Sequence, residues 1–346
     1  MGTEKIELMI AEKKIKRSEK VLVTGGGGFL GAAICGRLVN RGDDVRSLSR
    51  NYYSDLEAMG IEQIQGDICN PDIVEKACRG RELVFHTAAK PPPWGKYADY
   101  YRTNVSGTQN VIQACQQHNV PRLIYTSTPS VVFDGTDIEG ADESIPYPAK
   151  YTAFYPETKA LAEKQIVNAA GNQLRTVTLR PHQIWGPGDP HFVPRLIARA
   201  KKLKRIGGGK NRVDTTYIDN AALAHILAAD QLKKNAALSG NIYFISQGDP
   251  IPVWDMIDAI LTAAGESPVK GAMPYRIAWT IGAALEFSYR AFNITKEPLM
   301  TRFLADAVAK SHWFDISAAK RDLGYIVEVS TKEGLRRLEK WLNRKK

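Results

Sequence analysis

The sequence predicts an α/β protein, built as a Rossmann-type, doubly wound parallel sheet with a smaller, mostly C-terminal substrate domain. Two observations support this fold class. From Lys20 onward, short apolar runs rich in Val, Ile and Leu alternate with longer segments of helical periodicity, as they do where helices connect parallel strands. The first apolar run, residues 21–23, leads directly into a glycine-rich turn and a helical pattern. This order is typical of the first βαβ unit of a dinucleotide-binding domain.

The predicted elements follow one another regularly through the first half of the chain. We expect helices between successive strands, the first helix over 29–41, and strands over 21–23, 44–48, 61–65, 83–87, 122–127 and 175–179. The regularity weakens after the Trp-Gly-Pro-Gly segment at 185–188, where we place a domain boundary. The predicted division is a flexible extension (1–19), a dinucleotide-binding Rossmann domain (20–185) and a substrate-binding domain (186–346). A strand pattern at 241–246 leaves open a return of residues 213–264 to the first sheet.

The composition is that of an ordinary soluble enzyme, with 44% hydrophobic and 24% charged residues among 346. The formal net charge of +10 lies partly in two tails, 13–20 and 344–346, so we infer no nucleic-acid partner. The four cysteines show no Cys-x-x-Cys spacing, and no metal site is expected. Residues 1–19 lack the apolar core of a signal peptide, which favours a cytoplasmic protein.

The glycine-rich turn follows the first strand at Gly25, Gly28 and Gly31. Glycine permits a tight turn and lets a pyrophosphate approach the backbone at the positive end of the next helix. That helix is expected to begin at Phe29 and Leu30, whose N–H groups would contact the cofactor. The turn therefore predicts a dinucleotide site.

The ends of the next strands bear on the identity of the dinucleotide. An NAD-preferring site usually carries an acidic residue after the second strand, but Ser49 and Arg50 stand there. A serine hydroxyl and a guanidinium suit a 2′-phosphate, so we predict NADP, with NAD as the alternative. Asp67 and Ile68 are candidates to contact the adenine, although Asp67 could instead cap the following helix. Ala88 ends the fourth strand with a side chain small enough to admit a cofactor.

Three further residues carry the candidate chemistry. Tyr155 and Lys159 are four residues apart, hence on one face of a helix, and Thr128 follows an apolar strand. We predict that the Lys159 ammonium lowers the pKa of the Tyr155 phenol, which would make it a proton donor and acceptor near neutral pH. Thr128 could hydrogen-bond a substrate oxygen beside the phenol.

Together with Asn104, in the segment Asn-Val-Ser-Gly-Thr, these motifs resemble the extended short-chain dehydrogenases over almost the full length of the chain. Within that superfamily, residues 125–133, 184–189 and 213–221 look like the 3β-hydroxysteroid dehydrogenase branch. They are especially similar to the bacterial 2-alkyl-3-oxoalkanoate reductases of long-chain olefin synthesis. One departure is a threonine at position 128, where many relatives carry serine.

The resemblance implies a mechanism. Hydride passes between the nicotinamide C4 and a carbonyl carbon, Tyr155 protonates the carbonyl oxygen, and Thr128 orients it. Lys159 also holds the nicotinamide ribose. Asn104 supports the proton relay, and the backbone from Pro181 to Ile184 faces the carboxamide.

The substrate side is less sharply defined by the sequence. Trp94, in a proline-rich loop after the fourth strand, is a candidate pocket residue, as are Trp185, His191 and Tyr217. The segment 276–292 is largely apolar but too short and too rich in ionisable residues for a convincing membrane span. It could be a buried core helix, a cap over an apolar pocket, or a shallow membrane contact.

Three functions remain open from the residues. The first is a reductase of small hydrophobic 3-oxo or 3-hydroxy compounds, including 3β-hydroxysteroids and sterol-4α-carboxylates. The second is an NAD-dependent nucleotide-sugar epimerase, for which Arg195, Arg212 and Arg276 could bind a diphosphate. The third, a nonenzymatic dinucleotide sensor, would not need Tyr155 and Lys159 together. We expect the protein to form a homodimer. We also expect it to associate peripherally with a membrane or with another enzyme of its pathway.

Overall fold

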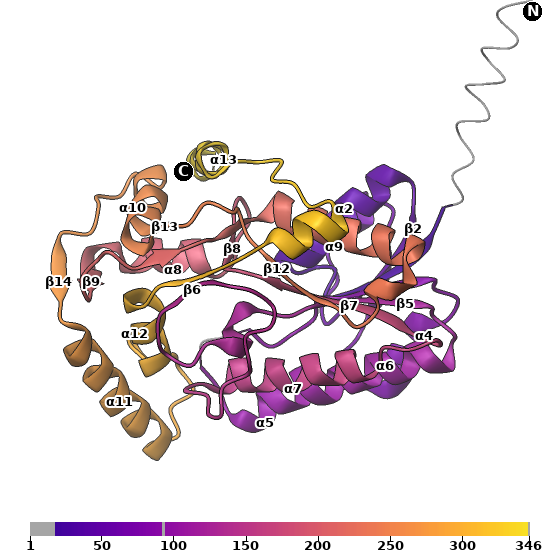
Figure 1. The fold of residues 1–346 in the computed structure, drawn as a ribbon, viewed down its shortest axis with the longest axis horizontal. Coiled ribbons are helices and arrows are strands. Elements are labelled where there is room, and N and C mark those ends of the chain that lie inside the picture. Colours follow the sequence, from indigo (N-terminus) through magenta and orange to yellow (C-terminus); the bar gives the residue numbers. More distant parts are fainter. Residues whose placement is uncertain (1–17, 92–93, 345–346) are drawn as a thin grey trace, which may run out of the picture.

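The computed structural model describes residues 18–91 and 94–344, and a seven-stranded parallel sheet forms its centre (Figure 1). The strands, in sheet order, are β12 (Ile242–Ile245), β7 (Arg175–Pro181), β5 (Arg122–Thr126), β4 (Leu83–His86), β1 (Lys20–Thr24), β2 (Asp44–Ser49) and β3 (Glu62–Gln65). The chain winds outward from β1 in one direction and from β4 in the other. The carboxyl ends of these two strands therefore border the crevice in which open α/β sheets bind ligands.

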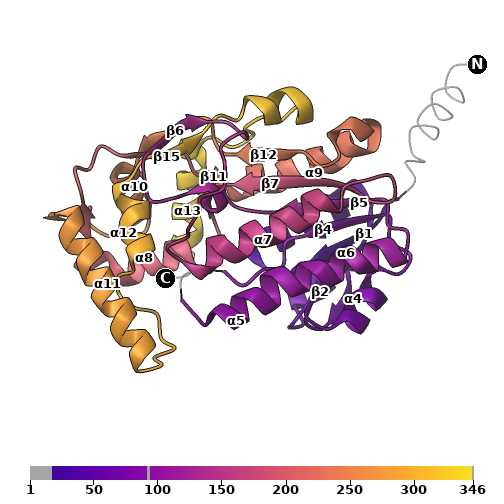
Figure 2. The same ribbon diagram turned by 60° about the horizontal axis from the view of Figure 1, so that its bottom comes forward.

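Helices cover both faces of the sheet (Figures 1 and 2). Successive side chains of β1 point to opposite faces, so Val21 and Val23 join one buried cluster and Leu22 joins the other. The first cluster packs under α2 (Phe29–Arg41) and α9 (Ile218–Lys234), and the second under α4 (Pro71–Cys78), α6 (Gly107–Gln117) and α7 (Phe154–Asn168). The doubly wound parallel sheet predicted from the sequence is confirmed.

Most predicted strands agree with the structure to within two residues. The strand pattern at 241–246 is confirmed as β12, which pairs in parallel with β7 and so returns the chain to the sheet. The predicted extension 1–19 lies outside the described residues except for its last two. Of these, Glu19 is buried and forms an ion pair with Arg122, so the ordered structure begins before β1.

A smaller unit stands beside the carboxyl ends of the strands, on the left in Figure 1. Its helices are α8 (Phe192–Arg199), α10 (Val253–Ala263), α11 (Tyr275–Ala291) and α12 (Arg302–Ala309). Its sheet has the order β13 (Ile251–Pro252), β10 (Arg212–Val213), β15 (His312–Phe314) and β6 (Ile138–Ala141). Because β6 comes from the segment between β5 and α7, the first half of the chain contributes to this unit.

The remaining elements are mostly short. The helices are α3 (Ser54–Ala58), α5 (Tyr97–Tyr100) and the C-terminal α13 (Thr331–Asn343). The π-helical segments are η1 (Tyr101–Ser106) and η5 (Ala319–Leu323), and the 3₁₀ segments are η2 (Pro129–Val132), η3 (Ala200–Lys202) and η4 (Ala236–Leu238). Two strand pairs complete the structure: β8 (Ile184–Trp185) with β11 (Thr216–Tyr217), and β9 (Lys204–Ile206) with β14 (Gly271–Met273).

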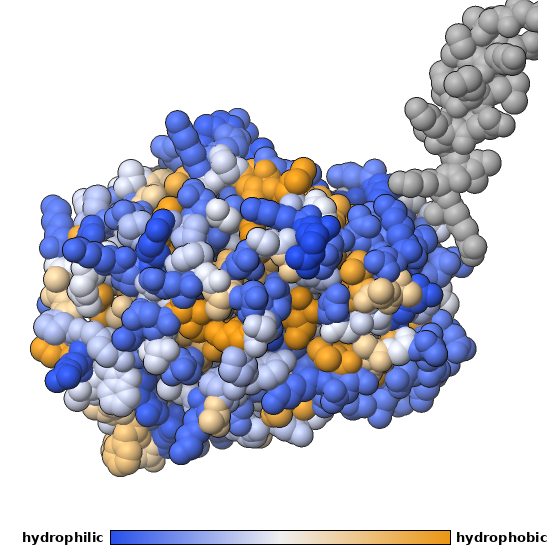
Figure 3. Space-filling view, in the orientation of Figure 1, coloured by the Kyte–Doolittle hydropathy of each residue, from blue (hydrophilic) through white to orange (hydrophobic). Residues whose placement is uncertain are grey.

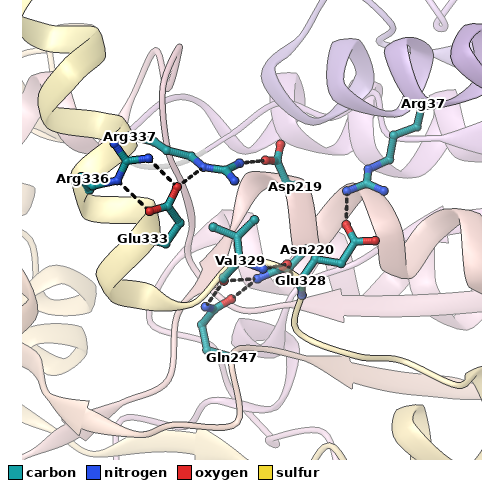
Figure 4. Close-up of polar contacts among 9 residues, drawn as sticks. All are labelled: Arg37, Asp219, Asn220, Gln247, Glu328, Val329, Glu333, Arg336 and Arg337. Atoms are coloured by element: carbon teal, nitrogen blue, oxygen red, sulfur yellow. Dashed lines mark hydrogen bonds and ion pairs between the residues drawn. The ribbon is translucent and has the colours of Figure 1, made fainter.

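A buried amide network attaches the C-terminal segment to the large sheet layer (Figure 4). The fully buried Asn220 of α9 accepts the backbone N–H groups of Glu328 and Val329, each at 3.0 Å. Its own amide donates to Gln247 at 2.6 Å and to the Val329 carbonyl at 2.8 Å. One side chain thus satisfies four polar partners that have little access to water.

Ion pairs nearer the surface surround this network (Figure 4). Arg37 of α2 pairs with Glu328 at 2.6 Å, and Arg337 of α13 pairs with Asp219 at 3.0 Å. Their side chains are 30–43% exposed, so solvent screens these pairs and each stabilises the fold little.

We expect Asn220→Ala to lower the free energy of unfolding by about 2–4 kcal/mol, because it leaves the backbone N–H groups of Glu328 and Val329 without an acceptor. Arg37→Ala, which removes an exposed pair on the same segment, should lower it by less than about 1 kcal/mol. Urea unfolding of both variants measures the difference. Equal losses would contradict the assignment of the buried amide as the main attachment.

Candidate active site

The glycine turn after β1 is closed by its own backbone. Gly25 has a φ of +73°, and its carbonyl accepts the Gly28 N–H at 2.8 Å. A Cβ on Gly31 would lie 2.1 Å from the same carbonyl oxygen, and a Cβ on Gly25 would lie 3.0 Å from the backbone of Ala88. The turn is therefore held tightly against the end of β4, and larger residues would force it open.

The turn presents the first amides of α2 to a cavity. Gly28, Phe29 and Leu30 line this cavity, and Gly28 occupies the N-cap position. Within this described segment no side chain caps the helix, and its first turn carries no acidic residue. Free amide donors and the positive end of the helix dipole suit a pyrophosphate, so this turn fits a dinucleotide.

Ser49 and Arg50 lie beside the turn, on the cavity wall. The Ser49 hydroxyl accepts the Gly27 N–H at 3.1 Å, which fixes it at the end of β2. Burial alone would raise the pKa of Asp67, but hydrogen bonds from Cys69 and the charges of Arg102 and Arg50 hold it below its ordinary value. Arg50 thus points its charge toward the site. Arg102, which the sequence interpretation did not single out, lines the same wall.

Asp67 does not cap the helix that follows it, contrary to the alternative considered from the sequence. Asn70 is the N-cap of α4 and accepts the N–H groups of Asp72 and Ile73. Asp67 instead accepts the Cys69 N–H at 2.9 Å and, with Ile68, lines the cavity. Their contact with the adenine stays a prediction.

Tyr155, Lys159 and Thr128 come together on the cavity wall, the first two from α7 and the third from the end of β5. The hydroxyls of Tyr155 and Thr128 share a hydrogen bond. Ser130, which the sequence interpretation did not assign a role, donates its N–H to the Thr128 hydroxyl at 3.3 Å. The Ser130 hydroxyl also lies 3.1 Å from the Thr128 hydroxyl, and either of the two can donate. The Thr128 proton can therefore be donated to Ser130, toward Tyr155 or to a substrate oxygen.

The Lys159 ammonium donates hydrogen bonds to two residues that the sequence analysis did not identify as candidates. Its Nζ donates to the Tyr125 hydroxyl at 2.7 Å and to the Thr126 carbonyl at 2.6 Å. Burial lowers the pKa of Lys159 to about 7, against the opposing effect of the Glu163 charge.

The prediction that Lys159 lowers the pKa of the Tyr155 phenol is wrong for this arrangement. Burial raises that pKa to about 12, and the hydrogen bond from Thr128 opposes the rise only in part. The physical reason is that the Lys159 ammonium is directed at Tyr125 and Thr126. Tyr155 is therefore a phenol that keeps its proton at neutral pH, which suits a proton donor.

Asn104 lies one layer behind the cavity wall, in the π-helical segment η1. Its side chain accepts the Lys90 N–H at 2.7 Å and donates to the Thr158 hydroxyl at 3.1 Å. It therefore ties the loop after β4 to α7. Its role in a proton relay stays a prediction, since its amide contacts neither Tyr155 nor Lys159 directly.

The cavity has a volume of about 1760 Å³ and continues from the glycine turn past Tyr155 into the smaller unit. Pro181 and Ile184, the expected neighbours of the carboxamide, lie on its wall. Its far half is lined mainly by apolar side chains from α8, α10, α11 and α12 and their connections: Leu196, Ile206, Val253, Trp254, Ile257, Met273, Ala278, Met300, Phe303 and Leu304.

Two of the four predicted substrate residues lie on this wall and two do not. Trp94 and His191 line the cavity. Trp185 and Tyr217 are core residues, which corrects the prediction. Trp185 is fully buried, donates its indole N–H to Thr215 at 2.9 Å and packs edge-on against Tyr217, with ring centroids 5.2 Å apart.

The apolar segment 276–292 forms α11, which covers the far end of the cavity through Ala278 and Ile281. The interpretation as a buried core helix is wrong, since Phe287 is 75% and Phe292 is 78% exposed. No helix in the described ranges is both long and apolar enough to cross a bilayer. The face shown in Figure 3 is mainly hydrophilic, with apolar side chains across its middle.

A histidine pair in the cavity wall was not foreseen. His182 and His312 are 2.8 Å apart between ring nitrogens, and the second ring also contacts the Ala307 carbonyl at 2.6 Å. They are 130 residues apart in sequence and meet only through tertiary structure. The neighbouring Gln183 has a φ of +31°, a conformation unusual for a residue other than glycine.

The cations proposed for an epimerase do not gather. Arg195 lines the cavity, where it pairs with Glu297 at 3.3 Å. Arg212 donates instead to the Pro250 carbonyl, and neither it nor Arg276 lies on the cavity wall. Within residues 18–91 and 94–344, no group of three or more His, Cys, Asp or Glu side chains could hold a metal ion.

Comparisons with known proteins agree with this arrangement. The model of the 3-beta hydroxysteroid dehydrogenase/isomerase family matches residues 22–273. The chain is 48% identical over 325 residues to a 2-alkyl-3-oxoalkanoate reductase of Stenotrophomonas maltophilia (strain K279a), covering 92% of this chain and 98% of that protein. It is 34% identical over 330 residues to the decarboxylating sterol-4-alpha-carboxylate 3-dehydrogenase of Mus musculus, covering 93% and 91%.

Solved structures share the fold. Gox2253 superposes with a TM-score of 0.77 at 24% identity, covering 95% of this chain and 99% of that one. MoeE5 in complex with UDP-glucose and NAD superposes with a TM-score of 0.73 at 24% identity, covering 94% and 99%. At this level of identity the likeness concerns architecture alone.

We expect Gly31→Ala to weaken dinucleotide binding by at least about tenfold, because the new Cβ would overlap the Gly25 carbonyl and open the turn. Gly36→Ala is the matched control in the same helix, since nothing lies within 4 Å of its Cβ. Fluorescence titration with NADPH and NADH measures both variants. Normal affinity in a folded Gly31→Ala protein would contradict the placement of the pyrophosphate.

Proposed function

Because the chain belongs to the 3-beta hydroxysteroid dehydrogenase/isomerase family, we propose that it is an NADP-dependent oxidoreductase that interconverts a ketone and a secondary alcohol. The proposed reaction is the reduction of a 2-alkyl-3-oxoalkanoate. One observation carries this proposal: Tyr155, Thr128 and Lys159 meet where the dinucleotide groove opens into an apolar cavity. The name of the Stenotrophomonas maltophilia relative supports the substrate class.

The residues divide the chemistry among them. A bound nicotinamide supplies or accepts the hydride. Tyr155, which keeps its proton at neutral pH, donates it to the oxygen of the ketone during reduction. Thr128 holds that oxygen beside the phenol, while its own oxygen accepts the Ser130 N–H. Lys159, whose ammonium is held by Tyr125 and the Thr126 carbonyl, has one further N–H donor for the nicotinamide ribose.

The apolar half of the cavity sets the substrate class. Side chains such as Ile257, Phe303 and Leu304 offer no partner for a sugar or diphosphate, but they bury hydrocarbon favourably. Of the three arginines that could bind the diphosphate of a nucleotide sugar, Arg195 reaches the cavity. A sterol-4α-carboxylate is the second candidate, favoured by the 34% identity to the mouse enzyme.

The preference for NADP rests on the end of β2. Ser49 is fixed beside the glycine turn, and Arg50 and Arg102 supply positive charge on the adjoining wall. These groups suit the dianionic 2′-phosphate, which an acidic residue at the same place would repel. The expected homodimer and the peripheral contact with a membrane or a pathway enzyme stay predictions.

The substrate class is tested by following NADPH oxidation with a long-chain 2-alkyl-3-oxo acid, a 3-ketosteroid and a nucleotide sugar. We expect turnover of the oxo acid and little or none of the nucleotide sugar. Tyr155→Phe should lower kcat by about 10²–10⁴-fold, because the proton donor is lost, while NADPH affinity stays within a few-fold. Preferred turnover of the nucleotide sugar, or full activity of the variant, would overturn the proposal.

The cofactor preference is tested with Arg50→Ala. Losing a guanidinium beside the 2′-phosphate should lower kcat/KM for NADPH by about 10–100-fold and leave kcat/KM for NADH nearly unchanged. Arg79→Ala, an exposed cation away from the cavity, is the control. Equal or better activity of the unsubstituted protein with NADH would refute the assignment to NADP.

A further inference from the structure

Tyr125 lies behind Lys159, away from the cavity wall, and contacts its ammonium group in two ways. The tyrosine is 1% exposed and is the fourth residue of β5. Its hydroxyl is 2.7 Å from the Lys159 Nζ, and its ring centroid is 4.2 Å from the same atom. A hydroxyl oxygen and an aromatic face both attract a cation, most strongly where water is excluded.

The ammonium determines what the Tyr125 hydroxyl oxygen does. Lys159 Nζ carries donors and no lone pair, so the Tyr125 oxygen must accept from it. The Thr108 hydroxyl must donate to the Asn104 carbonyl, 2.6 Å away, because a carbonyl can only accept. Thr108 can therefore only accept from the Nε2 of His86, which is 2.9 Å away.

The rest of the network agrees with this order. Burial and the nearby charge of Lys159 lower the pKa of His86 to about 3, so the ring is neutral at physiological pH. With its proton on Nε2, its Nδ1 accepts from the Thr24 hydroxyl at 2.7 Å. Thr24 in turn accepts the Ala88 N–H at 3.4 Å. These hydrogen bonds tie the ends of β1 and β4 to Thr108 of α6.

We propose that Tyr125 is a positioning residue for the reaction proposed above, on which this inference rests: it fixes the Lys159 ammonium so that one N–H faces the cavity. An ammonium has three N–H donors, and two are taken by Tyr125 and the Thr126 carbonyl. The third is left for the nicotinamide ribose and the substrate side. The other titratable groups around this ammonium are Glu163 and Tyr155 on α7 and His86 on β4.

Tyr125→Phe keeps the ring and removes the acceptor. Lys159 acts in its protonated form, and removing an acceptor of that form lowers its pKa further, so function should be lost at lower pH. NADPH affinity and kcat should both decline at high pH. In Tyr125→Phe we expect this decline to begin at a pH that is lower by about one unit or more. At pH 7.5, kcat should fall by about 10–100-fold. NADPH fluorescence titrations from pH 5.5 to 9 give a readout that needs no substrate.

Two variants separate positioning from general loss of stability. Tyr325→Phe removes another buried tyrosine hydroxyl, bonded to the Ser246 carbonyl at 3.0 Å, and should leave both pH profiles unchanged. Thr108→Val, which removes the hydroxyl that interacts with Tyr125, should shift them in the same direction by a smaller amount. Unshifted profiles in folded Tyr125→Phe, or equal shifts in Tyr325→Phe, would overturn the inference. If no offered ketone is reduced, the proposed reaction fails while the NADPH profile still tests Tyr125.

Discussion

The burial of the Lys159 ammonium between β5 and α7 is the constraint on which the rest of the site depends. A charge removed from water is costly unless protein groups take over its hydrogen bonds. Tyr125 and the Thr126 carbonyl do so from the strand, and the Glu163 charge favours the protonated form from the next turn of the helix. The demand for these partners fixes how α7 packs on β5, and with it where Tyr155 meets Thr128.

The sheet makes this arrangement rigid, and the smaller unit adds an apolar wall beside it. Thr24, His86 and Thr126 stand at the carboxyl ends of three strands, β1, β4 and β5, which are adjacent in the sheet. The polar groups of the site are thus tied to backbone that cannot shift independently. The apolar wall from α10, α11 and α12 then lowers the polarity of the far half of the cavity, which strengthens the charge–dipole interactions at its boundary.

Features that depend on local sequence were predictable, and those that depend on distant contacts were not. The glycine turn, the start of α2 and the spacing of Tyr155 and Lys159 each follow from a short segment, and the structure brings them together as expected. Trp185 and Tyr217 were misassigned because an aromatic residue near a domain boundary looks the same in sequence whether it fills a core or a pocket. Tyr125 was hidden in an apolar strand, although strand alternation places it on the α7 face with Leu123.

The central claim is that hydride and proton reach one carbonyl at the junction of Tyr155, Thr128 and the cofactor groove. The most direct measurement uses NADPH carrying deuterium at the transferable C4 position, with a 2-alkyl-3-oxo acid as substrate and mass spectrometry of the product. The account predicts a 3-hydroxy acid with one deuterium on the former carbonyl carbon. An unlabelled product, or label at any other carbon, would contradict it.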